Sequence, residues 1–163
     1  MPDSAPGSAS GSTPGTASVP TTGGTPPGAA GLAGLLAAMP FASHLGMTLD
    51  EATPEVARGS LAWSAERCTV GGALHGGALM TLADAVGAVC AYLNLPAGAG
   101  TSTVESKTNF LRAVRSGGVR ATARPLHVGG TVVVVQTDLR DDEDRLVGQT
   151  TQTQLVLTPK ARS

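Results

Sequence analysis

The chain is poor in the features that mark several common functional classes. Lys and Arg total 11 against 12 Asp and Glu, so the basic excess of a nucleic-acid-binding surface is missing. The aromatic residues are Phe41, Trp63, Tyr92 and Phe110, too few for base-stacking platforms. No apolar run approaches the about 20 residues that a membrane-spanning helix needs. We therefore expect neither a nucleic acid nor a membrane as a partner.

Cysteine is also scarce, and this bears on location and cofactors. Cys68 and Cys90 are the two cysteines, and their spacing does not match a metal-binding pattern. A reduced, cytoplasmic setting is the expectation for such a chain. We expect no metal and no other cofactor.

The first 30 residues lack apolar periodicity and aromatic side chains altogether. They contain six Pro and six Gly, with much Ser and Thr, and one charged residue, Asp3. Such a composition cannot bury enough surface to offset the entropy lost on ordering. A signal peptide is not indicated, because a basic start and an apolar run are missing. The sequence predicts a disordered tail over residues 1–30 and one domain over residues 31–163.

The hydrophobic pattern and the turn residues of positions 31–163 predict an α+β fold. An apolar helix runs from Gly31 to near Pro40, two strands flank a turn at residues 50–54, and a long helix runs from Gly77 to about Leu93. Four strands follow, separated by turns at residues 115–118, 129–130 and 141–145. This order favours a mostly antiparallel sheet of about six strands around one central helix. A helix that is apolar on nearly all sides needs cover on nearly all sides. We expect the sheet to curl round it and a second subunit to close the open side.

One carboxylate, Asp84, stands in the middle of that long helix. Its neighbours three and four positions away are Met80, Thr81, Gly87 and Ala88, none of which can pair with its charge. An unpaired carboxylate in apolar surroundings is costly or has a raised pKa. A solvated helix face would show more polar residues in this row. We therefore interpret Asp84 as a functional carboxylate.

The start of the same helix, His75-Gly76-Gly77, is the second candidate feature. Backbone N–H groups at a helix start are unpaired and lie at the positive end of the helix dipole. Glycine allows a ligand to approach them closely, so they could polarise a carbonyl oxygen as it becomes an oxyanion. Tight packing of the helix against the sheet would explain the two glycines equally well.

The spacing of these two features predicts a shared site. Gly76 and Asp84 are eight residues apart, which is about 12 Å along a helix. A donor to a carbonyl oxygen and a group acting on its carbon must each lie about 3 Å from those atoms. One helix cannot supply both groups to one substrate. Two antiparallel helices related by a two-fold axis could, so the site would lie at a dimer interface.

Three stretches together resemble the hotdog-fold acyl-CoA thioesterases, in particular the group that includes the phenylacetate-pathway thioesterases. They are LHGGALMTLADAVGA (residues 74–88), TVESKTNFLRAV (103–114) and LHVGGTVVVVQTDLRDDEDRLVGQTTQTQLVL (126–157). The resemblance implies a six-stranded antiparallel sheet wrapped round the central helix, in homodimers that pair into homotetramers. It also implies hydrolysis of an acyl- or aryl-acyl-CoA substrate to the free acid and CoA.

The resemblance assigns roles to individual residues. Asp84 falls on the family's catalytic carboxylate, which acts as nucleophile or general base, and Gly76 falls on the amide that polarises the thioester carbonyl. His75 would support that loop. Thr103 falls where the family carries a Ser or Thr that positions the water or the carboxylate. Gly77 would let the substrate approach the helix start.

The chain departs from the family pattern in its substrate contacts. Thr69 stands where the family often has Asn or Gln, and Gly130 stands where it often has Arg or Lys. Arg112 and Thr131, with Arg115 and Arg124, remain as candidates for CoA phosphate contacts. His44 and His127 are interpreted as structural.

Two alternatives remain from the residues alone. A non-hydrolytic acyl-CoA-binding module on the same fold is favoured by Thr69, and opposed by the joint presence of Asp84, Gly76 and Thr103. A hotdog hydratase would need Asp and His about five residues apart, and the residue five positions after Asp84 is Val89.

Overall fold

The computed structural model describes residues 28–158, so the predicted disordered tail lies outside the described part except for residues 28–30. The helices are α1 (Ala29–Ala37), α2 (Pro40–His44) and α3 (Gly76–Tyr92), with a 3-10 turn at Ala65–Arg67. The strands are β1 (Met47–Ala52), β2 (Ala57–Ala62), β3 (Gly100–Phe110), β4 (Gly118–Val128), β5 (Val132–Asp141) and β6 (Leu146–Leu157).

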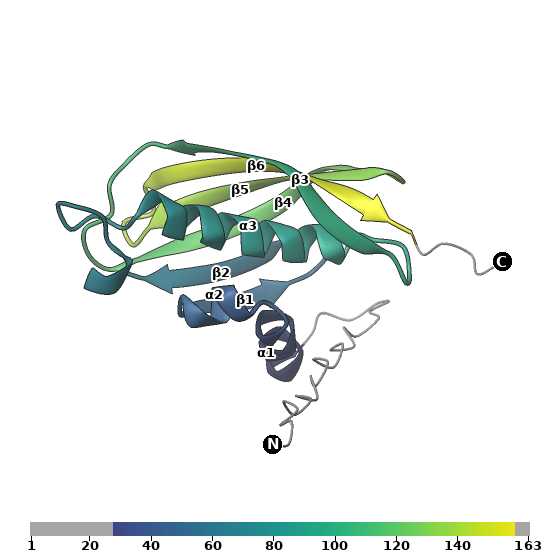
Figure 1. Cartoon of the computed structure of the whole chain (residues 1–163), viewed down its shortest axis with the longest axis horizontal. Helices are drawn as coiled ribbons and strands as arrows, with labels where there is room; N and C mark the ends of the chain where they lie inside the picture. Colours follow the sequence, from purple (N-terminus) through teal and green to yellow (C-terminus); the bar gives the residue numbers. More distant parts are fainter. Residues whose placement is uncertain (1–27, 159–163) are drawn as a thin grey trace, which may run out of the picture.

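The six strands form one antiparallel sheet in the order β1-β2-β4-β5-β6-β3. The sheet curves over α3, and α1 and α2 lie near β1 (Figure 1). The predicted hotdog arrangement is therefore confirmed. Some details differ from the prediction: α1 begins at Ala29, inside the predicted tail, rather than at Gly31, and α3 begins at Gly76 rather than Gly77. Pro40 begins a further short helix as well as ending the first. Proline is favoured at a first helical position because its fixed φ suits the helix and its missing N–H is not needed there.

The core lies between α3 and the inner face of the sheet. Along β5 buried and half-buried residues alternate strictly, as a period of two requires. Val135 and Leu139 of β5 pack with Leu82 and Val86 of α3 in one fully buried cluster. Burial of such side chains contributes about 1.5–3 kcal/mol each to folding. This layer fixes which face of each strand is turned towards α3.

The two edges of the sheet differ in their cover. The outer strand β1 is short and lies beside α1 and α2. The outer strand at the other end, β3, has 11 residues, and nearly all of them are exposed, including Val104 and Phe110. A long edge strand with unpaired backbone groups and apolar side chains is a surface on which another chain can pair. The edge at β3 is thus the open side of this sheet.

No helix within residues 28–158 has the length and apolar character needed to cross a membrane.

Close contact between β2 and α3 depends on Gly59. A Cβ atom at this position would lie 2.5 Å from the backbone oxygen of Thr48 and 2.9 Å from a methyl group of Val86. The backbone oxygen cannot rotate away, so we expect Gly59→Ala to lower the free energy of unfolding by about 1–3 kcal/mol. Urea unfolding measures the change.

Gly34→Ala is the matched control for this substitution. Gly34 lies in α1, and a Cβ there would meet nothing within 4 Å. Alanine favours a helix by up to about 1 kcal/mol over glycine, so this variant should be as stable as the wild type or more stable. Equal stability of both variants would contradict the proposed close packing at Gly59.

Candidate active site

The start of α3 is held by contacts from both sides. His75 is the N-cap residue, and its Nδ1 accepts a hydrogen bond from the N–H of Gly77 at 2.8 Å. The backbone N–H of His75 donates to the carbonyl of Arg67 at 2.8 Å, and that of Leu74 donates to the carbonyl of Val114 at 2.8 Å. A capping side chain satisfies one of the free N–H groups of a helix start. These three hydrogen bonds therefore hold the first turn of α3 and the residues before it in place.

This capping leaves the N–H of Gly76 free. The N–H groups of Ala78 and Leu79 donate to the carbonyl of His75, and the His75 side chain occupies that of Gly77. Within residues 28–158 nothing accepts a hydrogen bond from the Gly76 N–H. A Cβ at Gly76 would lie 3.1 Å from the ring of Phe110, which covers this position. Gly76 thus presents one free donor at the positive end of the helix dipole.

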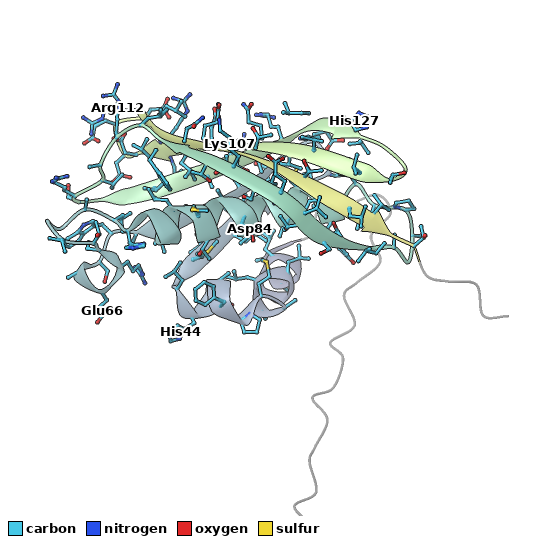
Figure 2. All side chains as sticks on the ribbon, turned by 45° about the horizontal axis from the view of Figure 1, so that its top comes forward. His44, Glu66, Asp84, Lys107, Arg112 and His127 are labelled. Carbon is cyan, nitrogen blue, oxygen red and sulfur yellow. The ribbon has the colours of Figure 1, made fainter. Side chains whose placement is uncertain are left out.

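Asp84 lies two turns further along α3, on the row of the helix that the sheet leaves uncovered. Met80 and Asp84 are exposed along this row, and Thr81 and Ala88 are half-buried. One carboxylate oxygen, Oδ1, lies 3.5 Å from the Thr103 hydroxyl of β3, at the long end of hydrogen-bonding distance. The same oxygen lies 3.4 Å from Nε2 of Gln152 of β6. The carboxylate therefore emerges between α3 and the β3–β6 end of the sheet (Figure 2).

The environment of Asp84 changes its acidity. Burial of the carboxyl group against β3 and β6 raises its pKa, and the hydrogen bond from Thr103 opposes this rise. Although the residue as a whole is exposed, the carboxyl end is partly enclosed by the sheet. A carboxylate with a raised pKa on an uncovered helix face is a candidate acid–base group.

A row of polar side chains continues from Asp84 along the inner face of β6. Nε2 of Gln154 donates to the Thr103 hydroxyl at 2.7 Å, and the Thr101 hydroxyl donates to Oε1 of Gln154 at 3.1 Å. Gln152 and Gln154 are almost completely buried. Because the Gln154 amide donates to Thr103, the Thr103 hydroxyl is left to donate its own hydrogen towards Asp84.

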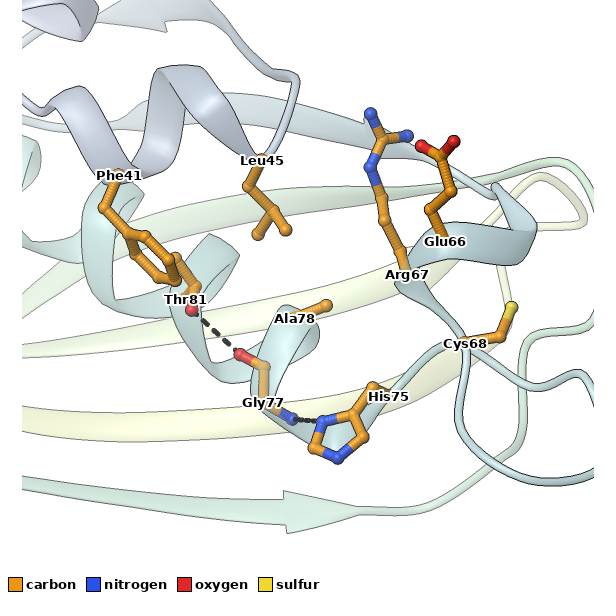
Figure 3. A pocket seen from close by; sticks show the side chains of 9 residues that line it. All are labelled: Phe41, Leu45, Glu66, Arg67, Cys68, His75, Gly77, Ala78 and Thr81. Carbon is orange, nitrogen blue, oxygen red and sulfur yellow. Dashed lines mark hydrogen bonds between the residues drawn. The ribbon is translucent and has the colours of Figure 1, made fainter.

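Two hollows flank the start of α3. One, of about 450 Å³, is lined by residues that include Phe41, Arg67, His75 and Thr81 (Figure 3). The other, of about 400 Å³, is lined by residues that include Gly76, Phe110 and Arg112. Gly76, whose N–H is free, is one of the residues that line the second hollow.

A smaller apolar pocket lies one turn beyond Asp84. Its volume is about 160 Å³, and Leu35 and Met39 come from the N-terminal segment to close it. Ala88 lines it from α3, four positions after Asp84, and Thr101 lines it from β3, two positions before Thr103. Residues four apart on a helix and two apart on a strand lie on the same side. The pocket therefore adjoins the carboxylate.

The structure brings some of the predicted site residues together and separates others. Asp84 and Thr103 are in contact, and His75, Gly76 and Gly77 share the helix start. Thr69 lies in a tight turn, where its N–H donates to the carbonyl of Ala73 at 2.8 Å, and its side chain is exposed.

The remaining candidates for CoA contacts lie at opposite ends of the sheet. Arg112 follows β3 at one end, whereas Gly130 and Thr131 form the β4–β5 turn beside His127 at the other end (Figure 2). One chain does not bring Arg112 and this turn into one site.

Sequence reasoning missed the glutamines under Asp84. The stretch QTTQTQ carried the signal, because residues 150, 152 and 154 share a face with the apolar Val156. That face is the inner one, so two buried glutamines could have been predicted. Within residues 28–158, no group of three or more His, Cys, Asp or Glu side chains is arranged to hold a metal ion.

Comparison with known proteins points to one family. The profile of the thioesterase superfamily matches residues 71–148. A candidate esterase of Mycobacterium tuberculosis is 32% identical over 114 residues, which are 68% of this chain and 81% of the relative. The 1,4-dihydroxy-2-naphthoyl-CoA hydrolase of Escherichia coli is 37% identical over 75 residues, which are 46% of this chain and 55% of that enzyme.

A solved structure supports the same assignment. The crystal structure of a thioesterase from Haemophilus influenzae superposes with a TM-score of 0.71 at 29% sequence identity. The match covers 75% of this chain and 85% of that one. The sequence comparison and the structural comparison therefore indicate the same family.

The raised pKa of Asp84 makes stability depend on pH. The folded state holds the proton more tightly than the unfolded chain, whose Asp pKa is about 3.9. The stability due to this proton is present below the unfolded pKa and is lost as the pH rises through the folded pKa. We expect Asp84→Asn, which cannot ionise, to unfold at a higher temperature than the wild type at neutral pH. The difference should shrink towards pH 3. A difference that is the same at every pH would show that ionisation of Asp84 has no part in it.

Proposed function

Since the chain belongs to the thioesterase superfamily and is a thioester hydrolase, we propose that it hydrolyses an acyl-CoA with Asp84 as the catalytic carboxylate. The observation that carries this assignment is the position of Asp84. It is the one charged residue of α3, it lies on the uncovered row of the helix, and Thr103 donates a hydrogen bond to it. The substrates of thioesterases contain a thioester carbonyl, and such a carboxylate can act on it.

The proposed site is shared between two subunits. Eight residues on one helix separate Gly76 from Asp84, about 12 Å along the axis, so one chain cannot offer both to one carbonyl. Two antiparallel copies of α3 would place Gly76 of one beside Asp84 of the other, with the two-fold axis near Met80, the midpoint. The exposed side chain of Met80 and the open edge of β3 support this pairing.

The chemistry then needs only groups of this chain and water. As general base, Asp84 takes a proton from water while the water oxygen attacks the thioester carbon. As nucleophile, its carboxylate attacks that carbon and forms an anhydride, which water then hydrolyses. In both routes the negative charge gathers on the carbonyl oxygen, where the free N–H of Gly76 from the other subunit donates to it. The CoA thiolate leaves and takes up a proton.

The hollows suggest where the two ends of the substrate bind. The apolar pocket beside Asp84 would take the acyl group. A dry cavity of about 150 Å³ can hold a benzene ring, so a pocket of about 160 Å³ suits an aromatic or short acyl group rather than a long fatty chain. The naphthoyl-CoA hydrolase among the relatives is named for an aromatic acyl group, which supports this substrate class. The hollow beside Gly76 would take the pantetheine arm, with Arg112 towards the phosphates.

Thiol release from a panel of acyl-CoAs tests the proposal. The panel contains phenylacetyl-, benzoyl-, butyryl- and palmitoyl-CoA, and the free CoA thiol is measured with a thiol-reactive dye. We expect the aromatic and short thioesters to be hydrolysed faster than palmitoyl-CoA. Asp84→Asn should lower kcat by about a hundredfold or more, because the group that reacts with water or the carbonyl is lost.

Binding of CoA thioesters to the same variant is the control. Asp84→Asn should still bind phenylacetyl-CoA in calorimetry, since the substitution leaves the hollows intact. Equal hydrolysis by the wild type and the variant would contradict the catalytic role of Asp84. Binding without hydrolysis by the wild type would identify the chain as an acyl-CoA-binding module instead.

A further inference from the structure

A buried glutamine lies directly under the carboxylate of Asp84. Gln152 comes from β6, has no exposed surface, and reaches α3 through its side-chain amide. Its Nε2 lies 3.4 Å from both the backbone carbonyl oxygen and Oδ1 of Asp84. Both of these atoms can only accept hydrogen bonds when the carboxylate is charged. The amide must therefore turn its NH₂ group towards Asp84.

This orientation leaves the other end of the amide without a partner. Oε1 of Gln152 is the one buried side-chain N or O atom within residues 28–158 that has no hydrogen bond. A buried polar group of this kind costs about 1–3 kcal/mol of stability. An apolar side chain of the same shape would avoid the cost, so packing alone does not explain a glutamine here.

The helix is shaped to receive this glutamine. Gly87 of α3 lies against the Gln152 amide, and a Cβ at position 87 would overlap Oε1. Glycine inside a helix lowers its stability by about 1 kcal/mol relative to alanine. Two separate costs, a glycine in mid-helix and an unpaired oxygen, thus accompany the contact with Asp84. Such local costs gather at functional sites.

The two carboxylate oxygens of Asp84 also differ in the number of hydrogen bonds that they accept. Thr103 and Gln152 both donate to Oδ1. Within the described part of the chain, Oδ2 has no hydrogen-bond donor. Two donors on one oxygen restrict rotation of the carboxylate and leave the second oxygen available to another group.

We propose that Gln152 is a positioning residue that holds Oδ1 of Asp84 from inside the sheet, so that Oδ2 faces the thioester or the attacking water. The proposal rests on the catalytic role proposed for Asp84. Gln152 itself does not touch the substrate. It acts by fixing the direction of the reacting oxygen, in the way that groups behind a metal ligand fix its orientation.

No ionisable side chain within residues 28–158 holds the Asp84 carboxylate in place of Gln152. β6 carries no ionisable side chain, and Glu105 and Lys107 of β3 pair with Thr153 and Thr151, whose side chains lie on the outer face of the sheet. The charged side chains of β4 and β5 also lie on that face, except Asp141 at the end of β5. The ionisable groups on the helices and on the segment before α3 are His44, Glu66, Arg67, Cys68, His75, Cys90 and Tyr92. None of them has a hydrogen bond or ion pair with Asp84.

Gln152→Met tests the proposal, because methionine has nearly the same shape but no N–H donor. We expect kcat to fall by about tenfold or more, with KM nearly unchanged, since only the direction of the carboxylate is lost. The acidic limb of the pH–rate profile should move to higher pH, because loss of a donor to the carboxylate raises its pKa. The melting temperature at acidic pH, where Asp84 is protonated, should stay the same or rise, because the unpaired oxygen is gone. Activity and stability would then change in opposite directions.

Gln149→Met is the matched control. Gln149 lies on the same strand with its side chain on the outer face, where its Nε2 donates to Asp138 at 2.8 Å. This variant should keep the wild-type kcat and the wild-type acidic limb. A Gln152→Met enzyme with unchanged kcat would overturn the proposal. A fall in kcat together with a fall in melting temperature and an unmoved acidic limb would also overturn it.

Titration of Asp84 by carbon-13 NMR separates this proposal from the proposed function. The Asp84 carboxyl signal is assigned from its absence in Asp84→Asn. Even in a protein that hydrolysed no thioester, Gln152→Met must raise the pKa of Asp84, and an unmoved pKa would contradict the contact. Should Gln152→Met fail to fold, Gln152→Glu keeps the shape and polarity. It places a second carboxyl group beside Asp84, so it should raise the pKa of the pair further, and an unmoved Asp84 titration would likewise overturn the proposal.

Discussion

One sheet cannot enclose a helix completely, and the rest of this structure depends on that limit. The six strands cover α3 from β1 to β3, and one row of the helix stays uncovered. The row carries Asp84, with Met80 one turn before it and Ala88 one turn after it. A single uncovered row with apolar neighbours is suited to another copy of the same helix. In the proposed dimer the carboxylate lies where two subunits meet, and the substrate binds between them.

The stability of the core and the demands of the proposed site oppose each other along β6. The inner face of β5 is mainly aliphatic, because Val133, Val135 and Leu139 pack in the hydrophobic core with α3, with Thr137 between the last two. The neighbouring strand β6 instead turns glutamines inward at positions 152 and 154, at the place where Asp84 emerges. Proteins commonly give up stability where activity needs polar groups in fixed positions. The cost is confined here to one end of the sheet, and the aliphatic layer of β5 offsets it.

Much of this could be predicted from the sequence, and the reasons are local. Hydrophobic periodicity predicts the apolar helix around Asp84 and the alternating strands after Pro96. The order of elements and the class of fold could therefore be predicted. Asp84 could be singled out because no neighbour on its helix can pair with it. Gln152 could not be placed beside Asp84, because that contact depends on the register of β6 against β3. The short helix beginning at Pro40 was missed, since five residues carry too little periodicity. Arg112 and Thr131 lie at opposite ends of the sheet because of the strand order, which the sequence pattern does not give.

Complementation between two inactive variants tests the shared site most directly. Gly76→Pro removes the free N–H, and proline fits there because His75 before it has a ψ of 136° and position 76 is the first of the helix. Gly76→Ala, which keeps the N–H and adds the same contact with Phe110, is its control. Gly76→Pro and Asp84→Asn are produced together with different tags, and the mixed dimer is purified through both. We expect each variant alone to be nearly inactive and the mixed dimer to regain about half the wild-type activity, because one of its two sites has both groups intact. A mixed dimer as inactive as its parents, with Gly76→Ala active, would contradict a site built from two subunits.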